Sequence, residues 1–175
     1  MRRKPPLIAA NSVVGRMAVW LATGLGIGFG TRAPGTVGGL WGLALLPLMD
    51  KAANVEVQLA IVAGLLLVGV VVCDLAARAL GDAEDPQPIV LDEIVALPIV
   101  FIAAPPLTWT LAIVGFLLFR LFDITKPGLV RWAERLPGGL GIVADDALAA
   151  ALAWATLRAL LWLDAAAGFH HLAAA

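Results

Sequence analysis

Long apolar segments separated by short polar stretches dominate the chain. Residues Leu59–Cys73 include no polar side chain, and with their flanks they approach the ~20 residues that a membrane-crossing helix needs. No charged residue occurs from Ile94 to Phe119, and Pro105-Pro106 interrupt that run near its middle, so we predict a tight helical hairpin there. No strand-like alternation persists. Because the backbone in lipid must satisfy its own hydrogen bonds, the spanning segments are expected to be helices.

Three shorter apolar segments predict further helices, at Val13–Thr23, Val37–Met49 and Ala147–Leu163. Polar connections are expected at 50–56, 74–85 and 120–146. Several apolar segments are too short for a full crossing, so they are expected to be re-entrant or packed inside a bundle. We therefore predict an all-α integral membrane helical bundle with short or re-entrant hairpins, forming one domain over residues 1–175, with 1–12 and 165–175 as loose termini.

Composition strengthens the membrane assignment. The 175 residues are 61% hydrophobic, well above the roughly 45–50% of soluble domains, and the mean hydropathy is +0.94. A net charge of −1 gives no electrostatic basis for a nucleic-acid partner. The single cysteine, Cys73, excludes an internal disulfide and is expected to be a small core or lipid-facing residue.

The positive charges predict how the chain is oriented. Arg2, Arg3 and Lys4 open the chain without a clean cleavage site after them, so we expect no cleaved signal and a cytoplasmic N-terminus. Most other positive charges lie around Arg32, around Arg78 and in the 126–135 stretch. Placing these in the cytoplasm leaves Lys51 and Pro105-Pro106 as tips on the other side. The glycine-rich 28–39 stretch and the polar stretches at 74–93 and 120–146 would then share the cytoplasmic face.

Acidic pairs in these stretches are the candidates for chemistry. Asp92-Glu93 directly precedes an apolar run, where each charge costs about 2.5–3.5 kcal/mol by insertion scales. Pro88 fits the first turn of a helix, which would put both acids about one turn inside it. The simpler interpretation is that these carboxylates complement a helix dipole.

Two further acidic sites follow. Asp123 comes three residues after Arg120 and three before Lys126, so the simpler interpretation is a salt-bridged helix end. Asp145-Asp146 opens the last apolar helix, where the simpler role is a cap. Adjacent like charges repel unless a cation lies between them. Because all three acidic sites fall on one predicted face, we favour a shared site.

The residue types of this shared site select its ligands. With no thiolate and no usable histidine, carboxylates favour Mg²⁺ or Ca²⁺ over zinc, and Mg²⁺ commonly binds together with substrate phosphate. The expected metal ligands are Asp85, Asp92, Glu93, Asp123, Asp145 and Asp146. The stretch GFGTRAPGTVGG at 28–39 exposes backbone N–H groups beside Arg32, which can hold a phosphate. We assign 32–36 to that site, and Gly24, Gly26 and Gly28 to packing or flexibility.

Four motifs in order give the chain a resemblance to a known family. They are APGTVGG, D-x-x-x-IV-x-DE, FR-x-x-D-x-x-KP and GG-x-GI-x-x-DD, and together they cover roughly residues 24–153. The chain resembles the phosphatidylglycerophosphatase A family of bacterial lipid phosphatases. The resemblance implies Mg²⁺-dependent hydrolysis of phosphatidylglycerophosphate to phosphatidylglycerol, in phospholipid biosynthesis, by a mostly helical enzyme at the inner membrane.

The resemblance also implies residue roles. The catalytic acids would be Asp92, Glu93, Asp123 and Asp146, and the phosphate-binding residues would be Arg32, Thr36, Arg120 and Lys126. Attack by metal-activated water is favoured over an aspartyl phospho-enzyme. Two alternatives stay open: a CDP-alcohol phosphotransferase-like membrane enzyme, or a transporter subunit in which buried acids carry protons or cations.

Overall fold

A computed structural model of the chain describes residues 12–81, 86–168 and 172. Within these ranges every regular element is a helix, which agrees with the expected all-α class. The elements in chain order are α1 Val13–Ala22, η1 Ile27–Phe29, α2 Pro34–Gly42, η2 Leu43–Leu45, α3 Leu46–Asp50, α4 Val55–Leu80, α5 Leu91–Ala96, η3 Leu97–Phe101, α6 Trp109–Thr125, α7 Gly128–Ala133 and α8 Gly139–Ala166.

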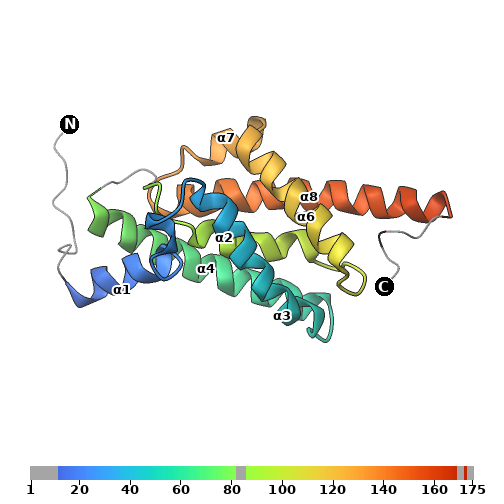
Figure 1. Ribbon diagram of the computed structural model, residues 1–175, viewed down its shortest axis with the longest axis horizontal. Helices are drawn as coiled ribbons and strands as arrows, with labels where there is room; N and C mark the ends of the chain where they lie inside the picture. The colour runs from blue at the N-terminus through green and yellow to red at the C-terminus, as the bar shows by residue number, and fades with distance from the viewer. Residues whose placement is uncertain (1–11, 82–85, 169–171, 173–175) are drawn as a thin grey trace.

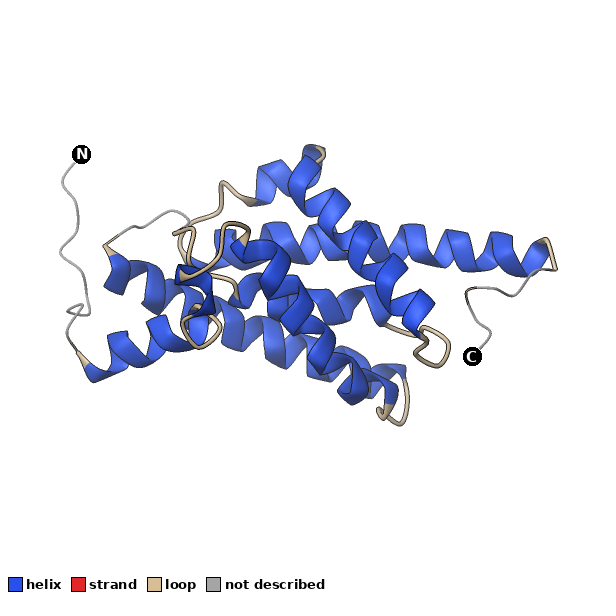
Figure 2. Cartoon of the chain, viewed as in Figure 1, coloured by secondary structure: helices blue, strands red, loops and turns tan. Residues whose placement is uncertain are grey.

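The helices form an elongated bundle around two long members, α4 and α8 (Figures 1 and 2). These two helices are antiparallel, because the start of α8 at Gly139 packs against Val70 and Asp74 near the end of α4. The α5–η3 segment packs against α8, and α6 crosses α8 obliquely (Figure 1). The last turns of α8 extend past the rest of the bundle. Helix ends therefore gather at two opposite ends of the molecule.

Local sequence signals account for several helix boundaries. Ser12, Asn54 and Thr108 each precede a helix, and each side-chain oxygen accepts a hydrogen bond from a backbone N–H three residues later, at 2.9–3.1 Å. Gly81 ends α4 in the left-handed conformation, with φ 79°. Such caps satisfy backbone groups that a helix end leaves without partners.

Two apolar clusters hold the bundle together. One joins η3, α6 and α8 through fully buried side chains such as Leu97, Phe119 and Leu157. The other joins α1, α4 and α8, and it contains Cys73, which confirms the expectation of a small core residue. Many members are alanines, which let helices approach closely. This close packing fixes where the polar helix ends meet.

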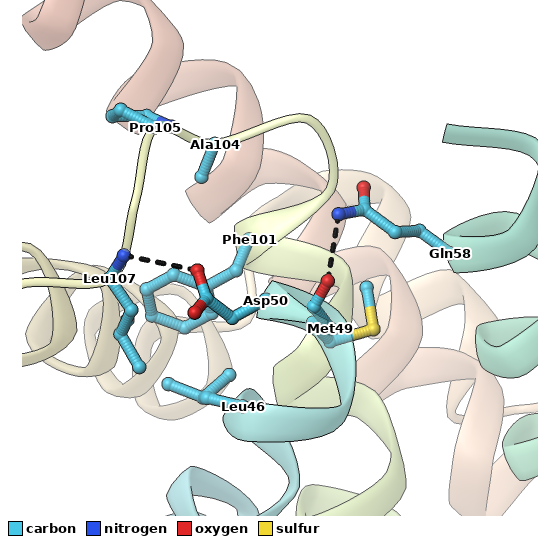
Figure 3. A pocket seen from close by; sticks show the side chains of 8 residues that line it. All are labelled: Leu46, Met49, Asp50, Gln58, Phe101, Ala104, Pro105 and Leu107. Atoms are coloured by element: carbon cyan, nitrogen blue, oxygen red, sulfur yellow. Dashed lines mark hydrogen bonds between the residues drawn. The ribbon is translucent and has the colours of Figure 1, made fainter. Parts of the chain in front are cut away.

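The two predicted outer tips are joined at one end of the bundle (Figure 3). Asp50 Oδ1 accepts a hydrogen bond from the Leu107 N–H at 3.3 Å. Gln58 donates to the Met49 carbonyl at 3.0 Å and accepts from the Ala103 N–H at 2.8 Å. A cavity of only about 60 Å³ lies between these segments. The hairpin predicted around Pro105-Pro106 is thus confirmed, with α5–η3 and α6 as its arms.

Helices α4 and α8 are long and apolar enough to cross a bilayer. Only 22% of the most apolar 18-residue stretch of α4 is buried against the protein. Leu67 and Val68 are 68% and 57% exposed, for example. The core helix of a soluble protein would be mostly buried, whereas an apolar surface of this kind is stable in lipid. The fold therefore agrees with the predicted membrane bundle.

Three predicted boundaries are wrong. Residues 74–80 continue α4 rather than starting a connection, because Ala76 and Ala77 are buried in the second apolar cluster, and Asp74 pairs with Arg78 one turn later, at 2.8 Å. Pro88 lies before the next helix, which begins at Leu91, so Asp92 and Glu93 are in its first turn. The last helix begins at Gly139, so Asp145 and Asp146 lie in its second turn and do not cap it.

Two other expectations need correction or fall outside the described residues. The segment expected as one helix at 37–49 is divided into α2, η2 and α3. The C-terminal segment expected to be loose from 165 is helical through Ala166. Arg2, Arg3, Lys4 and the candidate ligand Asp85 lie outside the described residues.

Candidate active site

Residues from the glycine-rich 28–39 stretch, from 87–93 and from 120–146 meet at the end of the bundle opposite the hairpin tip. A pocket of about 250 Å³ lies between the segment that leads into α2 and the segment that leads into α5. Arg32, Pro34 and Gly35 line one wall, and Gln87, Ile89, Asp92 and Glu93 line the other. The pocket therefore has acidic groups and a guanidinium group on facing walls.

Three carboxylates converge beside this pocket. One oxygen from each of Asp92, Glu93 and Asp146 lies within 4.8 Å of the others. All three side chains are nearly buried, with at most 9% of each residue exposed. Asp92 and Glu93 come from the first turn of α5, and Asp146 comes from the second turn of α8. Helix packing has thus brought together acids that are more than fifty positions apart in sequence.

Arg120 joins this cluster to α6. Its guanidinium group forms a short ion pair with Asp123, one turn later on α6, and lies 3.8 Å from Glu93 Oε1. Glu93 Oε2 is buried without a hydrogen-bond partner in the described part of the chain. A buried carboxylate oxygen in this state is costly and fits a cation ligand. The single positive charge of Arg120 therefore faces several carboxylates and cannot balance the charge of all of them.

Lys126 makes a second connection, between α6, α7 and α8. Its ammonium group lies 2.6 Å from Asp145 Oδ2 and 3.1 Å from Glu134 Oε1. Lys126 ends α6 in the left-handed conformation, with φ 42°, just before Pro127. A non-glycine residue in this conformation is uncommon and costs backbone energy. The two ion pairs supply interactions that hold it there.

Local charge and burial shift two pKa values. Burial raises the pKa of Glu93, and the charge of Asp123 adds to this effect, whereas a hydrogen bond with Asp92 and the charge of Arg120 oppose it. For Lys126, burial lowers the pKa, but the hydrogen bonds and charges of Asp145 and Glu134 outweigh burial, so its pKa is raised. Lys126 therefore carries a positive charge. A cation placed beside Glu93 would stabilise the charged form of its carboxylate.

Glycines of α2 allow this helix to pack closely against α5 and α6. A Cβ atom at Gly35 would collide with Glu93 Oε1 and lie 2.9 Å from Arg120 Nη1. A Cβ atom at Gly38 would lie 2.9 Å from the backbone oxygen of Val90 and 3.0 Å from Glu93 Oε2. The glycine-rich motif therefore includes positions that pack directly on the acidic cluster, in addition to Arg32 at the pocket.

The predicted residues divide into groups in space. Asp92, Glu93 and Asp146 form the cluster, Asp123 is linked to it through Arg120, and Asp145 is held by Lys126. Arg32 lines the pocket and Thr36 lies half-buried in the first turn of α2.

Three residues around the site were not predicted from the sequence: Asp74, Gln87 and Glu134. Asp74 accepts a hydrogen bond from the Gly139 N–H at 3.2 Å, which fixes the start of α8. Gln87 lines the pocket and Glu134 pairs with Lys126. Because Asp74 lies four residues before Arg78, its helical pairing was detectable from the sequence.

Comparisons with known proteins identify the family of the chain. The family model described as Phosphatidylglycerophosphatase A matches residues 20–161, which include every described residue of the site. The chain belongs to the phosphatidylglycerophosphatase A family. It is therefore an enzyme of the phosphatase class of hydrolases. No solved structure matches the chain.

Named relatives of the family cover most of the chain. Phosphatidylglycerophosphatase A of Haemophilus influenzae is 40% identical over 131 residues, which is 74% of this chain and 80% of the relative. Phosphatidylglycerophosphatase A of Escherichia coli is 35% identical over 130 residues, 74% of each protein. A relative from Bacteroides thetaiotaomicron, 34% identical over 84% of this chain and 95% of its own length, carries the provisional name phosphatidylinositol-3-phosphatase. These names share phosphate-ester hydrolysis on a lipid headgroup.

Proposed function

We propose that this member of the phosphatidylglycerophosphatase A family hydrolyses phosphatidylglycerophosphate to phosphatidylglycerol and inorganic phosphate, with Mg²⁺ as cofactor. The observation that carries the proposal is the meeting of Asp92, Glu93 and Asp146 beside a pocket that also contains Arg32. Family membership and the relatives' names support the reaction and the lipid substrate. The pocket volume of about 250 Å³ suits a polar headgroup whose acyl chains stay outside.

The donor set fits Mg²⁺. The cluster offers carboxylate oxygens, and Glu93 Oε2 is buried without a hydrogen-bond partner among the described residues. Hard divalent cations prefer such oxygens, and Mg²⁺ commonly adds substrate phosphate oxygens to one or two carboxylates. Asp92, Glu93 and Asp146 would hold the ion, with Asp123 and Asp145 as further acidic neighbours. When bound, Mg²⁺ would offset the carboxylate charge and polarise the phosphate group.

The chain's own residues account for the remaining steps. Arg32, on the wall opposite the acids, binds the terminal phosphate and stabilises charge on its oxygens during the reaction. A carboxylate of the cluster accepts a proton from the attacking water as the new oxygen–phosphorus bond forms. The bond from phosphorus to the glycerol oxygen breaks, and that oxygen takes up a proton. The products are the lipid alcohol and inorganic phosphate.

Two further cations have positioning roles in this proposal. Arg120 holds Glu93 and Asp123 in place through its ion pairs. Lys126 holds Asp145 and Glu134. Both remain candidates for direct phosphate contact, and Thr36 in the first turn of α2 is a third. Positive charge around Arg32, Arg78 and 126–135 supports placing the site at the cytoplasmic face of a bacterial inner membrane.

Phosphate release from phosphatidylglycerophosphate by the detergent-purified protein tests the proposal. We expect Mg²⁺-dependent release that a chelator abolishes and that Asp146→Asn lowers by about 10²- to 10⁴-fold, the usual contribution of a group that moves a proton in the reaction. Asp123→Asn should also lower release. Asp164→Asn is the matched control, because this aspartate lies on the same helix but close to its C-terminus, far from the site.

A second readout separates metal binding from catalysis. A ligand that binds the folded state raises the thermal unfolding midpoint. Mg²⁺ should therefore raise the midpoint of the wild type and of Asp164→Asn, but not that of Asp146→Asn.

Release of CMP from a CDP-alcohol, with no phosphate release, would instead favour the phosphotransferase alternative. Absence of phosphate release from folded protein in lipid would reject the phosphatase proposal.

A further inference from the structure

The turn between α1 and α2 is rigidly constructed although it is rich in glycine. Gly24, Leu25 and Gly26 have φ values of 58°, 62° and 91°. Thr23 is fully buried, donates to the Val19 carbonyl at 2.8 Å and accepts from the Gly26 N–H at 3.1 Å. The Thr23 carbonyl also accepts from the Gly28 N–H at 2.9 Å. This network fixes a backbone shape that leucine adopts only at an energetic cost.

The same turn exposes large apolar side chains. Leu25 is 49% exposed and Phe29 is 59% exposed. A left-handed conformation at a leucine is unfavourable, and its side chain gains little burial in return. The protein therefore holds two apolar side chains outward on a constrained backbone. An external apolar ligand would account for this arrangement.

The turn lies directly against the headgroup pocket. A Cβ atom at Gly28 would collide with the backbone oxygen of Pro88, so the two segments are in close contact. Pro88 is flanked in sequence by Gln87 and Ile89, which both line the pocket. Arg32, on the other wall, follows Phe29 by three residues, which limits their separation to roughly 11 Å. The exposed apolar side chains and the pocket residues therefore lie on segments that neighbour one another.

We propose that Leu25 and Phe29 bind the proximal acyl-chain region of the lipid whose headgroup occupies the pocket. This inference rests on the proposed function, because it assumes a phosphorylated lipid as substrate. The turn gives the enzyme a preference for the intact lipid over its water-soluble headgroup. Preorganisation explains the strain at Leu25, since a fixed contact loses less conformational entropy when the lipid binds.

Substitutions at the turn should separate lipid recognition from chemistry. Leu25→Asn keeps a residue that tolerates the left-handed conformation, and Phe29→Ser removes the aromatic contact. We expect each to raise the apparent KM for diacyl phosphatidylglycerophosphate in mixed micelles by about tenfold, as for loss of one buried apolar side chain. The kcat/KM for the deacylated, water-soluble headgroup should stay within about twofold of wild type, since that substrate has no acyl chain to lose.

Leu48→Asn is the matched control, because Leu48 has the same 49% exposure but lies on α3 at the opposite end of the bundle. Its KM for the diacyl lipid should be unchanged. An equal loss on both substrates, no loss on either, or an equal loss in Leu48→Asn would overturn the inference.

A measurement without turnover keeps this inference distinct from the proposed reaction. Phosphatidylglycerol with a photoreactive group near the glycerol end of an acyl chain should crosslink to the peptide containing residues 24–30, more than a matched phosphatidylcholine does. Selective crosslinking in a protein that releases no phosphate would reject the hydrolytic function and retain the lipid contact. Equal crosslinking by both lipids would show ordinary bilayer contact and overturn the inference.

Discussion

Glu93 shows how individual residues build the site. Its carboxylate contacts elements that are distant in sequence: Arg120 on α6 lies 3.8 Å away, and Asp146 on α8 belongs to the same acidic cluster. Gly35 on α2 leaves the space that the carboxylate occupies. The atoms next to Gly35 are the ends of flexible side chains, so an added methyl group can displace them without unfolding the protein.

Gly35→Ala is therefore expected to impair catalysis more than stability. The added Cβ would push Glu93 and Arg120 out of position, and misplacement by about 1 Å can cost roughly 100-fold in rate. We expect kcat to fall by about 10- to 100-fold with a thermal unfolding midpoint close to that of wild type. Steady-state kinetics and thermal unfolding of the purified protein measure the two effects.

Gly64→Ala provides the comparison for Gly35→Ala, because a Cβ atom at Gly64 meets nothing within 4 Å. Its kcat should equal that of wild type. A Gly35→Ala protein with full kcat would contradict the role of Gly35 in positioning Glu93.

At the scale of elements, the junction between α4 and α8 positions Asp145 and Asp146. The backbone N–H of Gly139 donates to Asp74 Oδ1 at 3.2 Å, and a Cβ atom at Gly139 would collide with the Val70 carbonyl and lie 2.7 Å from the Asp74 nitrogen. These neighbours are backbone atoms of a long helix, which cannot move without separating the two helices. The close approach therefore requires glycine.

Gly139→Ala should destabilise the protein by about 1–3 kcal/mol, the usual cost of overpacking a close contact. By contrast, Gly64→Ala on the open face of α4 should leave stability unchanged or raise it by up to about 1 kcal/mol, because alanine favours helix. Thermal or denaturant-induced unfolding in the same detergent compares the two variants. Equal midpoints for both would show that α4 and α8 do not meet as closely as described.

The whole molecule has two chemically different ends. One contains the site and the ion pairs of Arg120 and Lys126, and the other contains the joined tips near Lys51 and Pro105-Pro106. Exposed apolar side chains on α4 lie between these ends, as expected for a region in contact with lipid. The ends are therefore expected to face opposite sides of the membrane.

Cysteine labelling can test this orientation. The native Cys73 is fully buried and should react slowly. A membrane-impermeant maleimide added to spheroplasts should label Ala53→Cys at the tip end, while Pro137→Cys at the site end should react only after permeabilisation. Both positions are exposed and uncharged, so neither substitution changes the charge distribution that sets the orientation. The reverse labelling pattern would contradict a cytoplasmic site.

The sequence by itself determined the main apolar helices and the residue types of the candidate site. An uninterrupted apolar run predicted α4, and an apolar run broken by Pro105-Pro106 predicted the hairpin, because a backbone in lipid must form helices. The pairing of Arg120 with Asp123 was also expected, since residues three apart meet on a helix. These features depend on local periodicity and local chemistry, which a sequence records directly.

Only the tertiary structure decided which acidic residues meet. Asp92 and Glu93 join Asp146, while Asp145, its neighbour in sequence, is held by Lys126 on the adjacent helix end. Adjacent residues on a helix point in directions about 100° apart, so their surroundings depend on which helices pack on each side. That packing depends on close contacts at Gly35 and Gly139, between segments far apart in the chain. Local patterns do not encode such long-range contacts.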